Sequence, residues 1–299
     1  MTIKKMMMGA GAVGGITQAQ GVTSGYFSAG YQVPTIDKIA FATDGDTTDV
    51  GDLTSQRYGA AGSSSSVSGY CAGGVIGYST SNIIDKWSFS SDGNATDVGD
   101  LNTGAYMSAG TNSTTHGYIA GGVSQNTIGK YAYASDGNGT DVGDLTVSRR
   151  TMGGVSSTTD GHCMGGTVST TTTIDKTSFA SDGNSTDFGD LTSGRKPSGS
   201  NSPTHGYALG GHSTSNIIEN FAFATGGTCS DVGDLTQALD DHISCSSDIG
   251  GYAGGGYQGG YVTNIEKHIF ASGGNSSSVA SFGAHRSGSH VWGMSSHQV

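Results

Sequence analysis

Apolar and polar residues alternate over short segments of the chain, and these segments end at turns. One such segment runs from Ile84 to Phe89 and is followed by Asp92-Gly93-Asn94. Alternation places every second side chain on the same face of a strand, and Gly supplies the positive φ that a tight turn requires. The pattern therefore predicts a β-hairpin at this position.

The same hairpin returns along the chain at a nearly constant period. Its second strand contains Val-Gly-Asp-Leu at residues 50–53, and related motifs follow at steps of 48, 44, 46, 44 and 47 residues. The six motifs begin at Val50, Val98, Val142, Phe188, Val232 and Val279. A period of this length indicates repeated supersecondary units that stack on one another.

Each unit holds two further strand candidates. An apolar run that ends in Gly-Gly covers residues 69–74 and recurs at 117–122, 161–166 and 206–211. Another segment starts at Arg57 and recurs from Ala105, Arg149, Arg195 and Leu239. We name the four strands a, b, c and d in chain order from Arg57. Four short strands in each of six units predict an all-β fold, a six-bladed kelch-like β-propeller over residues 21–299, preceded by a Gly- and Met-rich arm at residues 1–20.

The ends of the repeat predict how the ring closes. The first unit starts at strand b near Gly25, and the segment from Arg286 to about Ser295 matches strand a. We expect this C-terminal strand to complete the first blade, because closure removes exposed strand edges. Val13 to Gly21 is the alternative segment for the same position. The spacing also predicts that His297 precedes a strand b, as His116 and His205 do.

The loops between strands b and c vary from 4 to 9 residues, whereas strands c and d keep their length. These loops are predicted to share one face with the connections from strand d to the next strand a, and binding sites concentrate in loops on a rigid scaffold. Sugar sites combine aromatic rings with a few polar groups, and Tyr adds contact area at a small entropy cost. The candidate ligand-binding residues are Tyr31, Tyr78, His212, Tyr257 and Tyr261 in the b–c loops and Arg57, Arg149 and Arg195 in the d–a connections. The d–a connections also contain Arg150 and Lys196, and the alternative is that these loops are merely solvated.

Composition excludes several classes of partner. A net charge of -11 with only 13 Lys and Arg argues against a protein that binds nucleic acid phosphates. No apolar run is long enough to predict membrane insertion. The start of the chain at Lys4 and Lys5 imitates a secretion signal, but several Gly residues interrupt the apolar run that a signal needs.

Motifs for metal, disulfide or catalytic chemistry have structural alternatives that we prefer. The turns at Asp44 and Asp92 resemble calcium loops, but a hairpin turn followed by an Asp that bonds local backbone explains them. Cys71 and Cys163 occupy the same position in separate blades and cannot approach closely enough for a disulfide. The Asp residues belong to repeating turns, which disfavours a glycan hydrolase or lyase with one catalytic pair. We expect no metal, no cofactor and no enzymatic activity.

The repeat resembles that of a known group of proteins. The Gly-Tyr-x-Ala-Gly-Gly strand, the Asp-Gly-Asn-x-Thr-Asp-Val-Gly-Asp-Leu hairpin and Ser-Thr-Thr-His-Gly-Tyr at 113–118 are similar to kelch-type repeats in virion proteins of tailed phages, especially marine and cyanobacterial ones. The resemblance covers about residues 22–299, and the opening Lys4 to Gly9 is similar as well. Unlike eukaryotic kelch repeats, the chain has only two Trp residues. It also lacks a cluster of His and Tyr beside a Cys of the kind found in galactose oxidases.

The resemblance implies a place and a role. It implies a structural protein on the virion surface, at a tail fibre or associated with the tail, that binds host surface glycans as an adhesin. The N-terminal arm would contact other virion proteins, and assembly with further copies of the chain is left open. The alternative from the same resemblance is a purely structural decoration or joint subunit.

Overall fold

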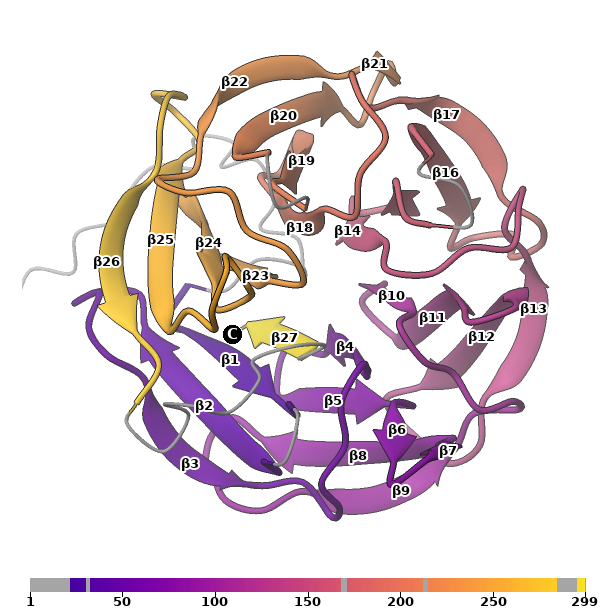
Figure 1. Cartoon of the computed structure of the whole chain (residues 1–299). Helices are drawn as coiled ribbons and strands as arrows, with labels where there is room; N and C mark the ends of the chain where they lie inside the picture. The colour runs from indigo at the N-terminus through magenta and orange to yellow at the C-terminus, as the bar shows by residue number, and fades with distance from the viewer. Residues whose placement is uncertain (1–21, 31–32, 168–170, 212–214, 284–294, 299) are drawn as a thin grey trace, which may run out of the picture.

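The fold is a six-bladed β-propeller, as the repeat predicts. The computed structural model describes residues 22–30, 33–167, 171–211, 215–283 and 295–298. Six antiparallel sheets stand around a central axis (Figure 1). In this part of the chain, no helix is long and apolar enough to cross a membrane.

Each blade has four strands, ordered from the innermost strand a to the outermost strand d. Blade 1 contains β27 (Ser295–Gln298), β1 (Ser24–Ser28), β2 (Thr35–Ala40) and β3 (Thr48–Asp52). Blade 2 contains β4 (Ala61–Ser64), β5 (Ser68–Ala72), β8 (Ile83–Ser88) and β9 (Thr96–Asp100). Blade 3 contains β10 (Ala109–Asn112), β11 (His116–Gly122), β12 (Gln125–Ala132) and β13 (Thr140–Asp144).

The remaining blades follow the same order. Blade 4 contains β14 (Gly153–Ser156), β15 (Asp160–Met164), β16 (Thr173–Ser178) and β17 (Thr186–Asp190). Blade 5 contains β18 (Ser198–Asn201), β19 (His205–Leu209), β20 (Ile217–Ala222) and β22 (Ser230–Asp234). Blade 6 contains β23 (Ile243–Ser246), β24 (Gly250–Gly254), β25 (Asn264–Ile269) and β26 (Ser277–Ser281). Two short strands, β6 (Val75–Ile76) and β7 (Ser79–Thr80), form a hairpin above blade 2, and β21 (Gly227–Thr228) adds to the outer edge of blade 4.

The C-terminal strand closes the ring, which confirms the prediction. Strand β27 pairs antiparallel with β1, from Gly25 opposite Gln298 to Ser28 opposite Ser295. The strand lies later than expected, because 13 residues separate β26 from β27, compared with 8 between β3 and β4. His297 is therefore inside the strand, opposite Tyr26, and the expectation that it precedes a strand b is wrong. The alternative segment, 13–21, lies outside the described residues, and β27 holds the place proposed for it.

The constant spacing of the hairpin among the repeats has its origin in contacts between blades. Gly93, in the c–d turn of blade 2, donates its N–H to the carbonyl of Val50 in blade 1 at 2.7 Å. Asp52 donates its N–H to Oδ1 of Asn94 in the same turn at 3.0 Å. A Cβ at Gly51 would overlap the backbone of Gly93, so only Gly permits this approach. The Asp-Gly-Asn and Val-Gly-Asp parts of the motif are thus the two halves of a joint between neighbouring blades.

In four of the joints, a carboxylate also holds a side chain of the preceding blade. Asp92 accepts hydrogen bonds from Lys38 Nζ and from the hydroxyl of Tyr26, each at 3.0 Å. We call this arrangement the rim latch; the other ion pairs of this type are Lys86–Asp136, Lys130–Asp182 and Lys267–Asp44. These Asp residues are the ones whose turns resemble calcium loops, and a Lys from the preceding blade contacts each of them.

Apolar cores lie between blades rather than within single sheets. Trp87 and Phe89 of blade 2 pack with Ile36 and Tyr26 of blade 1, and the rings of Tyr26 and Phe89 stack at 4.8 Å. Similar clusters join the other neighbouring blades. The four cysteines are buried free thiols that contribute to these cores. Each blade therefore depends on its neighbours for burial, which makes the ring a rigid support for its loops.

Candidate functional site

Three arginines that we expected on the binding face are buried. Arg57, Arg149 and Arg195 have exposed fractions of 0%, 0% and 1%. Each forms an ion pair at 3.0 Å with a carboxylate of strand c in its own blade, namely Asp85, Asp175 and Glu219 respectively. The assignment of these arginines to a ligand surface is therefore wrong.

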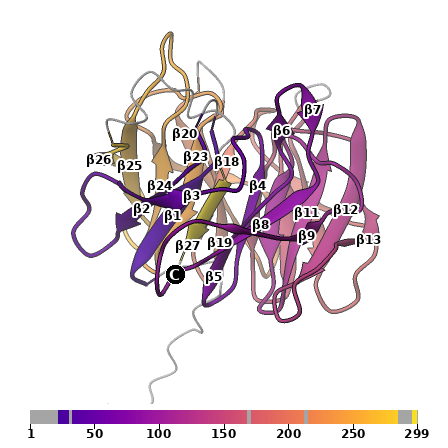
Figure 2. The ribbon, with the colours of Figure 1, turned by 90° about the horizontal axis from the view of Figure 1, so that it is seen from below.

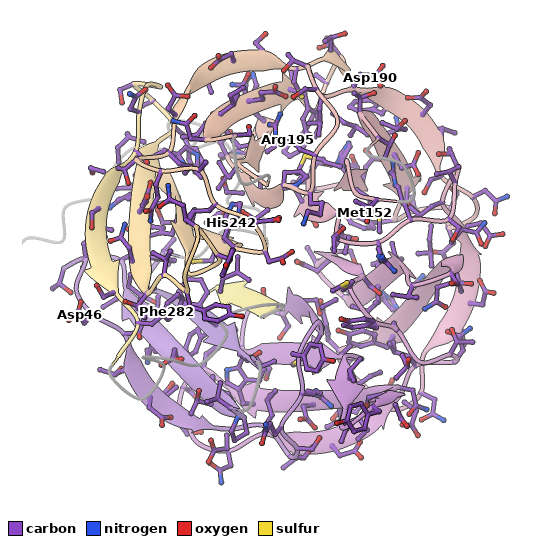
Figure 3. The ribbon with its side chains drawn as sticks, in the orientation of Figure 1. Asp46, Met152, Asp190, Arg195, His242 and Phe282 are labelled. Atoms are coloured by element: carbon purple, nitrogen blue, oxygen red, sulfur yellow. The ribbon has the colours of Figure 1, made fainter. Side chains whose placement is uncertain are left out.

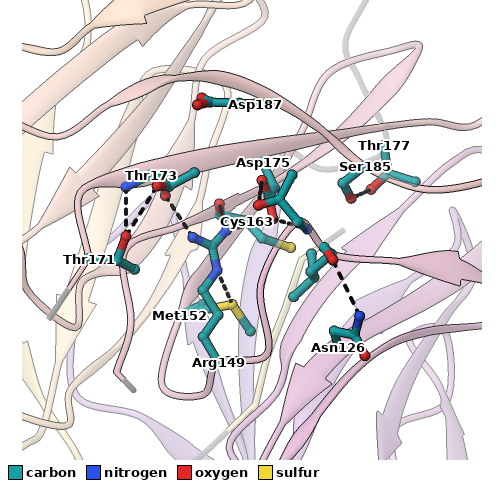
Figure 4. A network of polar contacts seen from close by, with 12 residues as sticks. Asn126, Arg149, Met152, Cys163, Thr171, Thr173, Asp175, Thr177, Ser185 and Asp187 are labelled. Atoms are coloured by element: carbon teal, nitrogen blue, oxygen red, sulfur yellow. Dashed lines mark hydrogen bonds and ion pairs between the residues drawn. The ribbon is translucent and has the colours of Figure 1, made fainter. Parts of the chain in front are cut away.

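Figure 4 shows the hydrogen bonds and the ion pair that one of these arginines, Arg149, forms in the interior. Arg149 Nη2 contacts Asp175 and also donates to the carbonyl of Cys163, while Nη1 donates to the carbonyl of Thr173. Nε donates to the sulfur of Met152 at 3.1 Å. Asp175 in turn accepts from the N–H and the hydroxyl of Thr146. Because these partners are protein groups, Arg149 fixes the start of its blade and has no role at the surface.

Each d–a connection has one buried position, and the residue after it points away from the interior. The buried positions are Arg57, Ala105, Arg149, Arg195 and Leu239. In extended chain, successive side chains alternate in direction, so the neighbours of the buried residues reach the face that carries the b–c loops. We call these five the rim residues: Tyr58, Tyr106, Arg150, Lys196 and Asp240. Every one is aromatic or charged, and none is buried. The prediction of surface residues in the d–a connections is thus wrong by one position, because the residue after each arginine is the one at the surface.

The residues that directly follow the rim residues, together with the rim residue Lys196, line a small cup at the centre of the loop face. The cup has a volume of about 140 Å³, and Met107, Thr151, Lys196, Asp241 and His242 are among the residues that line it. Figure 3 shows Met152 and His242, which also belong to its wall, on opposite sides of the central opening. Figure 2 shows the hairpin β6–β7 standing on one face of the ring.

The wall of the cup is held in an unusual backbone conformation. Gly59, Met107, Thr151 and Asp241 have φ values of 67°, 59°, 55° and 52°. This region is unfavourable for residues with a Cβ, above all for a β-branched Thr, and persists only where surrounding structure enforces it. Here the N–H of Met107 donates to the carbonyl of Gly59 at 2.8 Å, and the N–H of Thr151 donates to Met107 at 2.7 Å. The turned backbone thus links neighbouring blades around the mouth and keeps the wall rigid.

Charged and aromatic groups meet across the mouth of the cup. Lys196 Nζ lies 2.6 Å from Asp240 and 3.6 Å from Asp241. Tyr58 and Tyr106 pack edge to face at 5.6 Å. Burial raises the pKa of Tyr106 to about 12, with further upward contributions from Tyr58 and Asp241 and a downward one from Arg150. Groups from separate blades are therefore close enough to influence one another's charge.

Two tyrosines of one b–c loop stand beside this mouth, and a third stands on the hairpin above blade 2. Tyr78 is fully exposed in the loop of the β6–β7 hairpin. Tyr257 and Tyr261 are each 43% exposed, and their rings pack edge to face at 5.4 Å. Two backbone hydrogen bonds, of 2.8 and 3.1 Å, join Tyr257 to the rim residue Asp240. The structure therefore brings this predicted tyrosine pair next to the ion pair of Lys196.

Two predicted residues lie outside the described part of the chain, Tyr31 and His212. Sequence reasoning missed Tyr58, Tyr106, Asp240 and Asp241 as candidates. The repeat carried a usable signal, because one position in each d–a connection is aromatic or charged in five blades. Among the described residues, no group of three or more His, Cys, Asp or Glu side chains is arranged to hold a metal ion.

Neither a protein family model nor any curated protein sequence matches this chain.

Proposed function

We propose that this propeller is a non-enzymatic glycan-binding protein that holds its ligand at the cup and the surrounding rim. One observation carries the proposal: aromatic and charged rim residues from five blades, with the exposed tyrosine pair of one b–c loop, stand next to the residues that line one small cup. Aromatic rings suit the apolar faces of sugars, and charged groups suit their hydroxyls. Because the ring fixes the backbone of these loops, little entropy is lost on binding.

The biological setting of the proposal is the surface of a phage virion. Its support is the resemblance of the repeats to those of tailed-phage virion proteins. In this setting the protein is an adhesin on a tail fibre or beside the tail, and the N-terminal arm attaches it to other virion proteins. A joint or decoration subunit with no ligand is the competing role.

A triple variant tests the binding role. Tyr78→Ala, Tyr257→Ala and Tyr261→Ala together remove exposed rings without disturbing the cores between blades. We expect at least a tenfold loss of attachment to a printed array of bacterial surface glycans, because large interface side chains commonly contribute more than about 1.4 kcal/mol each when they are central to binding.

The control variant changes the opposite face. His116→Ala and His205→Ala remove side chains whose Nδ1 atoms hydrogen-bond to the neighbouring Thr115 and Thr204, each at 2.8 Å. This variant should bind like the wild type. Equal losses in both variants would indicate destabilisation, and a wild-type protein that binds no glycan would favour the joint subunit. Release of an unaltered glycan, checked by mass spectrometry, tests the absence of catalysis.

A further inference from the structure

The charge balance of the described residues leaves one basic side chain without a partner. The lysines of strand c pair with rim-latch aspartates, except for Lys176, whose Nζ lies 4.8 Å from the centre of the Phe188 ring. The buried arginines pair with strand c carboxylates, and Lys196 pairs with Asp240 and Asp241. Within the described ranges, Arg150 alone among basic residues has neither an ion pair nor a ring beneath its charge, and it is exposed.

The backbone of Arg150 is fixed, although its guanidinium has no ion pair among the described residues. Its N–H donates to the carbonyl of Thr167 at 3.2 Å, and the N–H of Thr167 donates back at 2.9 Å. The hydroxyl of Thr151 also donates to the carbonyl of Arg150, at 2.6 Å. The guanidinium therefore extends from a rigid base directly before Thr151, which lines the cup, and its charge acts on the rim residue Tyr106. A planar guanidinium binds carboxylate or sulfate through two parallel hydrogen bonds, which a neutral side chain cannot reproduce.

The size of the cup limits what can enter. About 140 Å³ is less than half of the ~300 Å³ at which sites for drug-sized ligands begin, so one sugar ring fits and a chain of several does not. Below the cup, the inner strands approach so closely that a Cβ at Gly110 would overlap the backbone of Gly62. The next cavity along the axis measures about 40 Å³, which has room for about one water molecule. A ligand therefore enters from the loop face and stops after its first residue.

From these observations we infer that the cup takes the terminal residue of an acidic glycan, and that Arg150 binds its carboxylate or sulfate group. In this arrangement Lys196 and Asp241 in the wall bind hydroxyl groups of the same residue. The rings of Tyr257 and Tyr261, beside Asp240, contact the sugars that follow. The inference rests on the proposed function, since it names the class of glycan at that site.

Arg150→Gln tests the inference on an array that carries each glycan with a neutral terminal residue, a carboxylated one, its methyl ester and a sulfated one. The wild type should bind the charged termini at least tenfold more tightly than the neutral ones and the ester, as expected when a charge-assisted hydrogen bond is lost. Arg150→Gln should remove this preference, whereas Arg150→Lys should retain part of it. Lys176→Gln, which removes the same unit of charge elsewhere, should leave the preference intact.

The outcomes separate the two proposals. Equal binding of neutral and charged termini, or a preference that survives Arg150→Gln, would overturn the inference and leave glycan binding in place. A preference for internal residues over terminal ones would overturn the end-on entry. Binding of no glycan by the wild type would overturn both the proposed function and the inference.

Discussion

The buried ion pair of blade 4 gives the sharpest test of how this propeller is held together. Arg149 and Asp175 are both fully buried, and their charges lie 3.0 Å apart. Removing one partner leaves the other charge buried without compensation, which costs about 3–5 kcal/mol. We therefore expect Arg149→Ala alone, or Asp175→Gly alone, to lower the free energy of unfolding by this amount.

The chain itself suggests the compensating double variant. In blade 3 the equivalent positions hold Ala105 and Gly129, so that blade folds with neither charge. Arg149→Ala with Asp175→Gly copies blade 3 and removes both charges together. The double variant should be more stable than the sum of the single losses predicts, with a coupling energy of about 1–3 kcal/mol.

Urea unfolding followed by circular dichroism and by tryptophan fluorescence provides the measurement, because coincident transitions justify a single free energy. Losses that add to within ~0.5 kcal/mol would refute the reasoning, since independent sites behave in that way. A loss below about 1 kcal/mol for either single variant would also refute it, because that is the cost of an exposed pair.

Three further predictions concern ring closure, metal and pH. Deleting residues 286–299 should prevent cooperative folding because β1 loses its partner β27, whereas deleting residues 1–20 should leave a propeller that melts cooperatively, as calorimetry would show. EDTA should leave the melting temperature unchanged, since lysines contact the turn aspartates; a fall that calcium reverses would contradict this. Burial lowers the pKa of His162, His242 and His268 to about 4, below the ordinary value of 6.5. As the pH falls, the unfolded chain therefore takes up protons before the folded one does. The free energy of unfolding should be full above pH 6.5 and fall between pH 6.5 and pH 4. The loss should approach about 3 kcal/mol per histidine, and His162→Tyr, which copies the other blades, should remove about a third of it in urea unfolding at pH 7 and pH 4.

The repeat period made the architecture predictable, because a joint between blades constrains the sequence at fixed intervals. Gly51 recurs in the motif because a Cβ there would meet the backbone of the next blade, and Gly93 recurs because its φ of 98° favours Gly. The turns resemble calcium loops because they carry the aspartates of these joints. The ion pair between Lys38 and Asp92 shows this role of the turn aspartate. That contact joins residues 54 positions apart in the chain, so no local pattern reveals it.

The candidate site was less predictable because the d–a connections alternate in direction without a marked pattern. Arg149 and Arg150 are adjacent and chemically identical, yet one is buried and the other exposed. The position of Arg149 is buried in other blades as well, as Ala105 and Leu239 show, and the carboxylate of Asp175 from a different strand supplies the ion-pair partner that a buried arginine needs. Comparison of blades indicates this ion pair, because in blade 3 Ala105 replaces the arginine and Gly129 replaces the carboxylate.

The distribution of charge also bears on how specificity could arise at the cup. The net charge is -11, and the outer strands of blades 1 to 5 carry exposed aspartates such as Asp49 and Asp97, whose Oδ1 atoms each accept a local backbone N–H at 3.1 Å. An acidic glycan that lies flat across the ring would meet these carboxylates and be repelled, and such repulsion disfavours the wrong mode of binding. A terminal residue that enters the cup meets Arg150 and remains remote from the outer strands. The acidic surface and Arg150, which has no ion pair among the described residues, therefore act in the same direction, since both would favour the end-on binding that we propose at the centre of the loop face.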